Sequence, residues 1–221
     1  MNNIKDYRDK EQKMYIIANI FVLILLSDLP DFLNFQIPWI DAFVKLVDIS
    51  LLSSTIYIFA FLADALFSSS IKMKMLYFWG HLPGETIFST LKKNNTDLRF
   101  STEHLLEKYK KIYEGMPTDK QKKYRYENDH WYRIYNRYRD IPMIFVSNRD
   151  YLLCRDLYIS TIIIVICYVI SCSILSVFYW NIESVVYLIC MLLVTNISAH
   201  IKGRRFAMNV VAYDLHTDNT K

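Results

Sequence analysis

The chain has 221 residues, of which 53% are hydrophobic and 15% aromatic, and it carries a formal net charge of +4. So many apolar residues exceed what one or two soluble domains need, and only four glycines and five prolines argue against a loop-rich β protein. The four cysteines form no CxxC pair, so neither a disulfide framework nor a zinc site is expected. The composition therefore favours an all-α integral membrane protein.

The first apolar run covers residues 14–27, which is short for a membrane span of about 20 residues. Extended over its flanks to residues 12–28, it predicts a transmembrane helix. The alternative is a helix that lies in the membrane interface. No small-residue cleavage site follows the run, so we do not expect a cleaved signal peptide.

Residues 42–68 predict a second span that contains two carboxylates. Small or acidic residues recur at helical spacing on one face of this helix: Ser53, Ala60, Asp64 and Ser68. The candidates for lining a pore or packing helices are Asp48, Ser53, Ala60 and Asp64. Small residues let another helix approach closely. The alternative is a wet pathway, because carboxylates inside a membrane seldom meet lipid.

Residues 69–156 form the one sizeable polar segment and predict a helical domain. Ser101 is the expected N-cap of a helix over residues 102–114. Thr118 and Gln121 fit a capping box for the next helix. Along that helix, an aromatic and apolar face is predicted for Trp131, Ile134, Tyr135 and Tyr138.

From Pro142 we expect one continuous helix to Trp180, because no helix-breaking residue lies between Met143 and Trp180. Its 24 residues from Leu157 onward carry no formal charge. As a helix they are about 36 Å long, which is enough for a third span. Residues 185–199 predict a fourth span. The expected organisation is therefore a tail and first hairpin (1–68), a helical domain (69–156), a second hairpin (157–199) and a tail (200–221).

Charge predicts the orientation of the four spans. The two short connectors are acidic or nearly neutral, whereas residues 69–156 hold 17 Lys and Arg against 11 Asp and Glu, a difference of +6. The positive-inside rule places the central domain and both termini in the cytoplasm.

Common enzyme signatures are absent: the sequence has no HExxH, GxSxG, P-loop or glycine-rich dinucleotide turn. Its five histidines are scattered. We therefore expect no catalytic activity, no cofactor and no metal. A membrane-embedded enzyme that acts on lipid through distant residues remains an alternative.

Residues 108–139 contain ten Lys or Arg, seven Tyr and one Trp. Arginine grips phosphate in a bidentate manner and aromatic rings stack on bases, which is how single-stranded nucleic acid is held. The predicted ligand-binding residues are Trp131, Tyr132, Arg133, Tyr135, Arg137, Tyr138 and Arg139. The alternatives are contact with lipid head groups and packing in a core.

Four residues where the third span enters the membrane are candidates for coupling and gating: Arg149, Tyr151, Arg155 and Asp156. Arg149 and Asp156 are seven residues apart and share a face of the helix. An arginine at the hydrocarbon boundary needs a partner. Candidate partners are Asp64, Asp214, a lipid phosphate or a bound ligand.

The runs NRDYLLCRDLY (148–158) and KGRRFAMNV (202–210), within four predicted spans and an inner helical segment, resemble small membrane effectors of bacterial anti-phage defence. The nearest resemblance is to the channel-forming effector of the Hailong system. It implies a homo-oligomeric pore, here taken as a tetramer, in the bacterial inner membrane. It also implies control by the DNA oligomers of a cognate nucleotidyltransferase, and depolarisation of the host membrane.

These observations leave two main hypotheses for the function. The first is a membrane channel gated by a nucleotide or a single-stranded oligonucleotide. The second is a non-conducting membrane anchor or scaffold that recruits a cytoplasmic partner.

Overall fold

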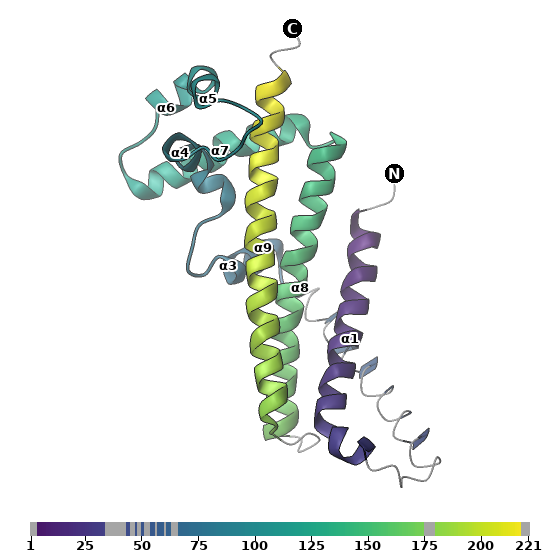
Figure 1. Cartoon of the computed structure of the whole chain (residues 1–221). Coiled ribbons are helices and arrows are strands. Elements are labelled where there is room, and N and C mark those ends of the chain that lie inside the picture. The colour runs from purple at the N-terminus through teal and green to yellow at the C-terminus, as the bar shows by residue number, and fades with distance from the viewer. Residues whose placement is uncertain are drawn as a thin grey trace. The chain divides into compact units, whose positions relative to one another are not determined.

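The structure is a computed structural model that describes residues 4–33, 43–44, 47, 50, 54–55, 57–59, 61–62, 66–174 and 180–217 (Figure 1). These residues form helices and connecting loops without any strand, which confirms the predicted all-α class. The helices are α1 (Ile4–Leu33), α3 (Ser69–Leu76), α4 (Pro83–Lys93), α5 (Thr102–Lys108), α6 (Lys110–Glu114), α7 (Lys120–Tyr138), α8 (Pro142–Ser173) and α9 (Ile182–Thr217).

Two helices, α8 and α9, are long and apolar enough to cross a membrane. The predicted start of α8 at Pro142 is confirmed, and the helix continues without a break to Ser173. It ends before the expected Trp180, and residues 175–179 lie outside the described part of the chain. Helix α9 contains the predicted fourth span and runs on through residues 200–217. Several large apolar side chains of α9 are exposed, among them Ile189, Leu193 and Ile197, as lipid-facing residues would be.

The chain divides into two compact units. Unit 1 consists of residues 1–76 and 152–199, and unit 2 of residues 77–151 and 200–221. Unit 1 therefore includes α1, α3 and most of the apolar parts of α8 and α9. Unit 2 includes α4 to α7 together with the polar ends of the same two long helices.

The core of unit 1 is built from one apolar face each of α1 and α8, with Leu188 of α9. Its fully or almost fully buried members are Ile16, Ile20, Leu23, Ile24, Ile159, Ile163, Ile164 and Tyr168. On α1 these residues recur at intervals of three or four, so they lie on one side of the helix. This stripe confirms that the apolar run of residues 14–27 is part of a helix.

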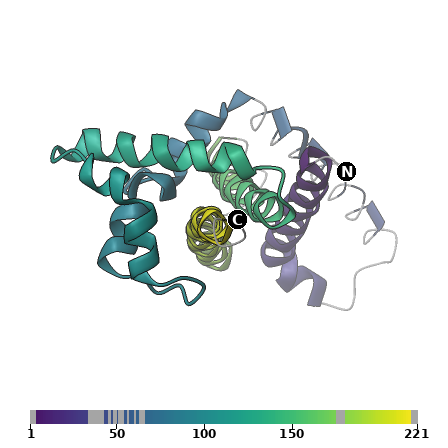
Figure 2. The ribbon, with the colours of Figure 1, turned by 90° about the horizontal axis from the view of Figure 1, so that it is seen from above.

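Unit 2 is organised around the packing of α4 on α7 (Figure 2). Gly84 makes the close approach possible, because a Cβ atom there would lie 2.6 Å from the Asn128 Oδ1 atom and 2.8 Å from the Trp131 ring. The buried Glu127 carboxylate links the two helices, since it accepts hydrogen bonds from the backbone N–H of Ser89 at 2.9 Å and from the Ser89 hydroxyl.

The helix ends of unit 2 follow the predicted capping chemistry with two differences. Ser101 is the N-cap of α5, and its hydroxyl accepts from the His104 N–H at 3.2 Å, as predicted. The expected single helix over residues 102–114 is interrupted at Tyr109, whose φ and ψ of −98° and 21° leave the helical region. Helix α7 begins one residue later than expected, because the Asp119 carboxylate caps it by accepting from the Lys122 N–H.

Candidate functional site

The aromatic residues predicted to bind a ligand on α7 lie mainly in the core of unit 2. Trp131 is buried, and its Nε1 atom donates a hydrogen bond to the Ala207 carbonyl at 3.2 Å. The Tyr135 ring stacks parallel to the Trp131 ring at 5.7 Å, and both rings contact Phe206 edge-on. Tyr138 packs against Tyr213. These contacts join α7 to α9 and correspond to the packing alternative for this face.

The charged residues of the same predicted set lie on the outside of α7. Tyr132, Arg133, Arg137 and Arg139 are all exposed. Arg139 lies 3.7 Å from the carboxylate of its neighbour Asp140. Arg137 lies 3.7 Å from the Asp214 carboxylate and also contacts the Tyr138 ring. The three arginine side chains are therefore accessible to phosphate groups from solvent.

Asp214 is the buried carboxylate of unit 2. Its Oδ2 atom accepts a hydrogen bond from the Tyr109 hydroxyl at 2.7 Å and lies 3.3 Å from the Lys108 ammonium. Burial, together with the Asp214 charge, raises the pKa of Tyr109. The sequence made Asp214 one candidate partner for an arginine at the point where α8 enters the membrane. Among the described residues, however, Asp214 contacts Lys108 of α5, Arg137 of α7 and Tyr109, which lies between α5 and α6.

The residues predicted to couple the two ends of α8 fall into two groups. In unit 2, Arg149 lies 3.0 Å from Asp150, which also pairs with Lys202 of α9 at 3.0 Å. Tyr151 is buried and stacks against Phe206. In unit 1, Arg155 and Asp156 are both buried and contact each other.

A cluster of four charged residues is centred on Asp156, and we call it the Asp156 cluster: Arg8 of α1, Lys72 of α3, and Arg155 and Asp156 of α8. Arg155 donates from Nε and Nη2 to the Asp156 Oδ1 atom, at 2.9 and 2.7 Å. Its Nη1 atom donates to the Ser69 hydroxyl at 2.9 Å. Arg8 lies 3.1 Å from the other carboxylate oxygen, and Lys72 lies 3.7 Å from Oδ1.

The cluster is unusual because three cations surround one carboxylate in a buried place. The side chains of Arg155 and Lys72 are 4% and 7% exposed, and that of Arg8 is 21% exposed. Withdrawing charges from water is costly, and among the contacts of the described residues given above the three cations share the Asp156 carboxylate. The cluster is therefore a place where an added anion, or a movement of one helix, would change the energy strongly.

A row of polar contacts continues from the Asp156 cluster between α1 and its neighbours. Gln12 donates to the Ser160 hydroxyl at 2.9 Å, and the hydroxyls of Tyr15 and Thr161 are hydrogen-bonded at 2.7 Å. One turn further on, the Tyr187 hydroxyl donates to Asn19 at 2.8 Å. Unit 1 thus contains a polar seam beside its apolar core.

The four residues predicted to line a pore or pack the second span, Asp48, Ser53, Ala60 and Asp64, lie outside the described residues. Arg8, Lys72 and Ser69 were not among the predicted site residues. The signal that could have found the two cations is their position, since Arg8 lies just before the first predicted span and Lys72 just after the second.

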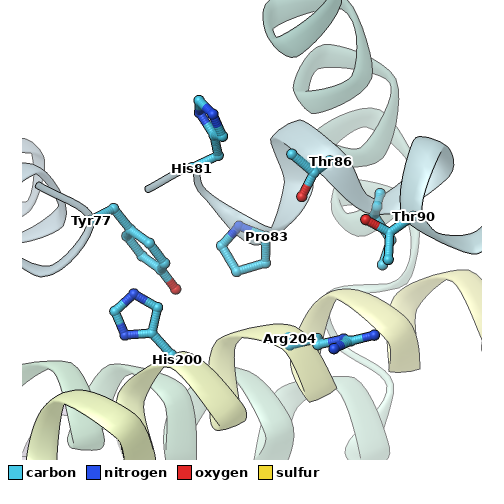
Figure 3. A pocket seen from close by; sticks show the side chains of 8 residues that line it. Tyr77, His81, Pro83, Thr86, Thr90, His200 and Arg204 are labelled. Carbon is cyan, nitrogen blue, oxygen red and sulfur yellow. The ribbon is translucent and has the colours of Figure 1, made fainter. Parts of the chain in front are cut away.

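Unit 2 also contains a pocket with a volume of about 270 Å³ between the start of α4 and the adjoining part of α9 (Figure 3). Its lining residues include polar and basic side chains: Tyr77, His81, Thr86, Thr90, His200 and Arg204. The rings of Tyr77 and His200 meet edge to face at 4.7 Å. Gly203 leaves room for Tyr77, because a Cβ atom there would lie 2.6 Å from its hydroxyl oxygen. This pocket was not predicted.

No protein-family model, curated protein or solved structure matches the chain. Among the described residues, no group of three or more His, Cys, Asp or Glu side chains is placed to hold a metal ion. The class is therefore defined by the described residues alone: they form helices without a strand, two of which are long and apolar enough to span a membrane, with an ion cluster buried in one unit and exposed arginines on the other.

Proposed function

We propose that this chain is a membrane channel or pore-forming effector whose opening is controlled by a nucleotide or a single-stranded oligonucleotide. The ligand would bind to the exposed arginines of unit 2, and the Asp156 cluster of unit 1 would hold the gate. The proposal includes four membrane spans, with the central domain and both termini in the cytoplasm, as the charge distribution favours.

The observation that carries the proposal is the Asp156 cluster. An anchor needs only apolar helices, whereas a buried group of three cations and one carboxylate is expensive in a membrane protein. Such groups mark ion pathways and moving parts when they occur in or next to membrane spans. The polar seam from Gln12 to Tyr187 adds side chains that can contact water between helices.

The ligand side of the proposal rests on Arg133, Arg137 and Arg139, which offer bidentate donors to phosphate groups. Among the predicted aromatic residues of this surface, Tyr132 is exposed, so it is the residue suited to stacking on a base. Because Trp131 and Tyr135 pack inside unit 2, the proposed mode of binding is more electrostatic than the sequence suggested.

Homo-oligomerisation is part of the proposal, because one copy with four spans is too small to enclose an aqueous pore. The resemblance favours a tetramer in the bacterial inner membrane that is paired with a cognate nucleotidyltransferase. It also favours a role in anti-phage defence by membrane depolarisation.

Ion flux from liposomes that contain the purified full-length protein tests this function. We expect Arg155→Ala to change basal flux about 5-fold or more, because loss of a buried ion pair shifts a two-state gate by about 1–3 kcal/mol. Lys110→Ala is the matched control, since Lys110 is exposed and makes only a long contact with Glu114. Unchanged flux in a correctly inserted Arg155→Ala protein would contradict the assigned role of the cluster, and absence of flux with and without ligand would contradict a channel.

The second candidate function is a non-conducting membrane anchor or scaffold. It is favoured by the use of Trp131 and Tyr135 as core residues and by the engagement of Arg137 with Asp214, since these contacts reduce the surface left for a nucleic acid. Under this alternative, the arginines of α7 recruit an acidic partner protein.

A further inference from the structure

We infer that the pocket of unit 2 is a binding site for the phosphate group of an anionic membrane lipid. It is lined by Tyr77, His81, Thr86, Thr90, His200 and Arg204, together with Pro83 and Ile87 (Figure 3). The inference goes beyond the proposed function, because it holds whether or not the protein conducts ions.

The first argument is the charge of the lining. Arg204 is a permanent cation, and two histidines accompany it, while the lining contains no carboxylate. Arg204 makes no ion pair within the described part of the chain. The Glu85 carboxylate does not line the pocket but lies 3.8 Å from His81, and it accepts from the Leu82 N–H at 2.9 Å, so Arg204 is the cation of the lining that has no carboxylate partner among the described residues. The pocket is therefore built to receive a negative group.

The second argument is a buried donor without an acceptor. The Tyr77 side chain lines the pocket and is only 8% exposed, yet its hydroxyl makes no hydrogen bond within the described residues. Figure 3 shows this hydroxyl directed toward His200 and Pro83. Burial, with a smaller contribution from the neighbouring Tyr151, raises the pKa of Tyr77, so the hydroxyl keeps its proton. A buried hydroxyl without a partner costs free energy, and a phosphate oxygen would supply the acceptor.

The third argument is the presence of further donors on the opposite wall. Thr86 and Thr90 are four residues apart on α4 and so lie on one face of that helix. In Figure 3 their side chains lie above Arg204. Two hydroxyls and one guanidinium on facing walls match the several oxygen atoms of a phosphate.

The fourth argument concerns the source of the phosphate. The apolar run of α9 ends at Ala199, so His200 follows it directly and Arg204 lies about 7.5 Å further along the helix. The polar head-group layer is about 5–8 Å thick on each side of the hydrocarbon core. Arg204 thus lies at the depth of lipid phosphates. Basic pockets at this depth bind anionic head groups.

The size of the pocket also favours a lipid head group as the ligand. At about 270 Å³ it is smaller than the roughly 300–1,000 Å³ of sites for drug-sized ligands, and it suits a head group better than a chain of nucleotides. The ammonium of a zwitterionic lipid would find no carboxylate in the lining. We therefore expect phosphatidylglycerol to bind in preference to phosphatidylcholine.

Native mass spectrometry of the full-length protein in detergent tests the inference, with phosphatidylglycerol and phosphatidylcholine of identical acyl chains as probes. Phosphatidylglycerol is expected to bind about tenfold more tightly than phosphatidylcholine, or better. Arg204→Gln should weaken phosphatidylglycerol binding about tenfold or more, because charge-assisted hydrogen bonds are removed. The matched control is Arg205→Gln, which removes the same charge from the next residue of α9. Arg205 is also exposed but does not line the pocket, so the affinity should stay unchanged.

Tyr77→Phe provides a second variant that does not depend on Arg204. It removes a hydroxyl without a partner, so the thermal midpoint without lipid should stay the same or rise, while lipid affinity falls several-fold. Equal binding of the two lipids would overturn the inference. Equal losses of phosphatidylglycerol affinity in the Arg204 and Arg205 variants would also overturn it, and so would an unchanged affinity in Tyr77→Phe. Glycerol 3-phosphate serves as the soluble arm: if it binds in the pocket more tightly than phosphatidylglycerol, the phosphate does not come from lipid.

Discussion

Asp156 in unit 1 and Asp214 in unit 2 are both almost completely buried, and each is surrounded by basic side chains. Their partners differ. Asp214 accepts a hydrogen bond from the neutral Tyr109 hydroxyl, and of its two cations Lys108 is largely buried whereas Arg137 is largely in water, with side chains 15% and 67% exposed. Asp156 is held by the guanidinium of Arg155 and lies near Lys72 and Arg8, all of them largely buried.

The difference shows that the charge of the same buried residue type can be compensated in two ways. A neutral donor shares the stabilisation of Asp214, and Arg137 is exposed enough to be solvated by water when the carboxylate is lost. At Asp156 the charges depend on one another. Loss of the Asp156 carboxylate would remove a contact from Arg155, Arg8 and Lys72 at once.

The largest expected effect is therefore that of Asp156→Asn. Removing the carboxylate that Arg155, Arg8 and Lys72 share takes away the buried partner of Arg155 and should lower the free energy of unfolding by about 3–5 kcal/mol. Chemical denaturation of the detergent-solubilised protein measures it, with Asp140→Asn as the control, because Asp140 is exposed. A loss no larger than that of Asp140→Asn would remove the distinction between the two carboxylates.

The next effect is that of Asp214→Asn, for which we expect a loss of about 1–3 kcal/mol, because a hydrogen bond and two ion pairs are weakened. Tyr109→Phe should cost less, about 1 kcal/mol. The double variant should cost less than the sum of the two single variants, since both remove the same hydrogen bond. Denaturation of the same preparations measures all three. If Asp214→Asn lowers the free energy of unfolding as much as Asp156→Asn does, the exposure of the surrounding cations does not determine the cost of losing the carboxylate.

The proposed binding surface allows a second comparison, between charged and aromatic residues of α7. Replacing Arg133, Arg137 and Arg139 by Gln should lower the slope of log K against log salt for a single-stranded oligonucleotide. The expected decrease is roughly 0.7 for every phosphate group that the variant no longer neutralises. Tyr132→Leu should weaken binding with little change in slope, because stacking releases few counterions. Binding titrations at several salt concentrations measure both, and an unaffected affinity in all variants would exclude α7 as the ligand surface.

Sequence reasoning predicts the local features of this fold well. Pro142 marks the start of α8, Ser101 caps α5, and the spacing of Trp131, Ile134 and Tyr135 identifies the inward face of α7. Each of these depends on residues close together in the chain. Helix periodicity and capping chemistry are local, so one sequence is enough to read them.

The sites were less predictable, because their members come from distant parts of the chain. The partners of Asp156 include Arg8 and Lys72, and the pocket joins Tyr77 to Arg204. Composition alone cannot tell an aromatic residue that stacks on a base from one that packs on Phe206. It predicted the arginines of α7 as hydrogen-bond donors to phosphate, and it left both ligand binding and core packing open for Trp131.

A third carboxylate, Asp97, should show the smallest effect. It forms an ion pair with Arg99 at 2.6 Å, but the arginine is 39% exposed. Hydrogen bonds from Arg99 are the main reason why the pKa of Asp97 is lowered. A lowered pKa means that the folded state favours the ionised carboxylate. The resulting stability is present above the ordinary pKa near 4 and is lost as the pH falls through the lower pKa of the folded state.

Because solvent screens this pair, its contribution should be about 0.2–1 kcal/mol near neutral pH. We expect the difference in unfolding free energy between wild type and Asp97→Asn to be constant from about pH 7 to about pH 5 and to shrink below about pH 4. Asp140→Asn, which removes an exposed carboxylate, should show a smaller difference throughout. Unfolding curves at a series of pH values measure these differences. A loss at Asp97 comparable with that at Asp156 would mean that burial of the cations does not set the order of the three carboxylates.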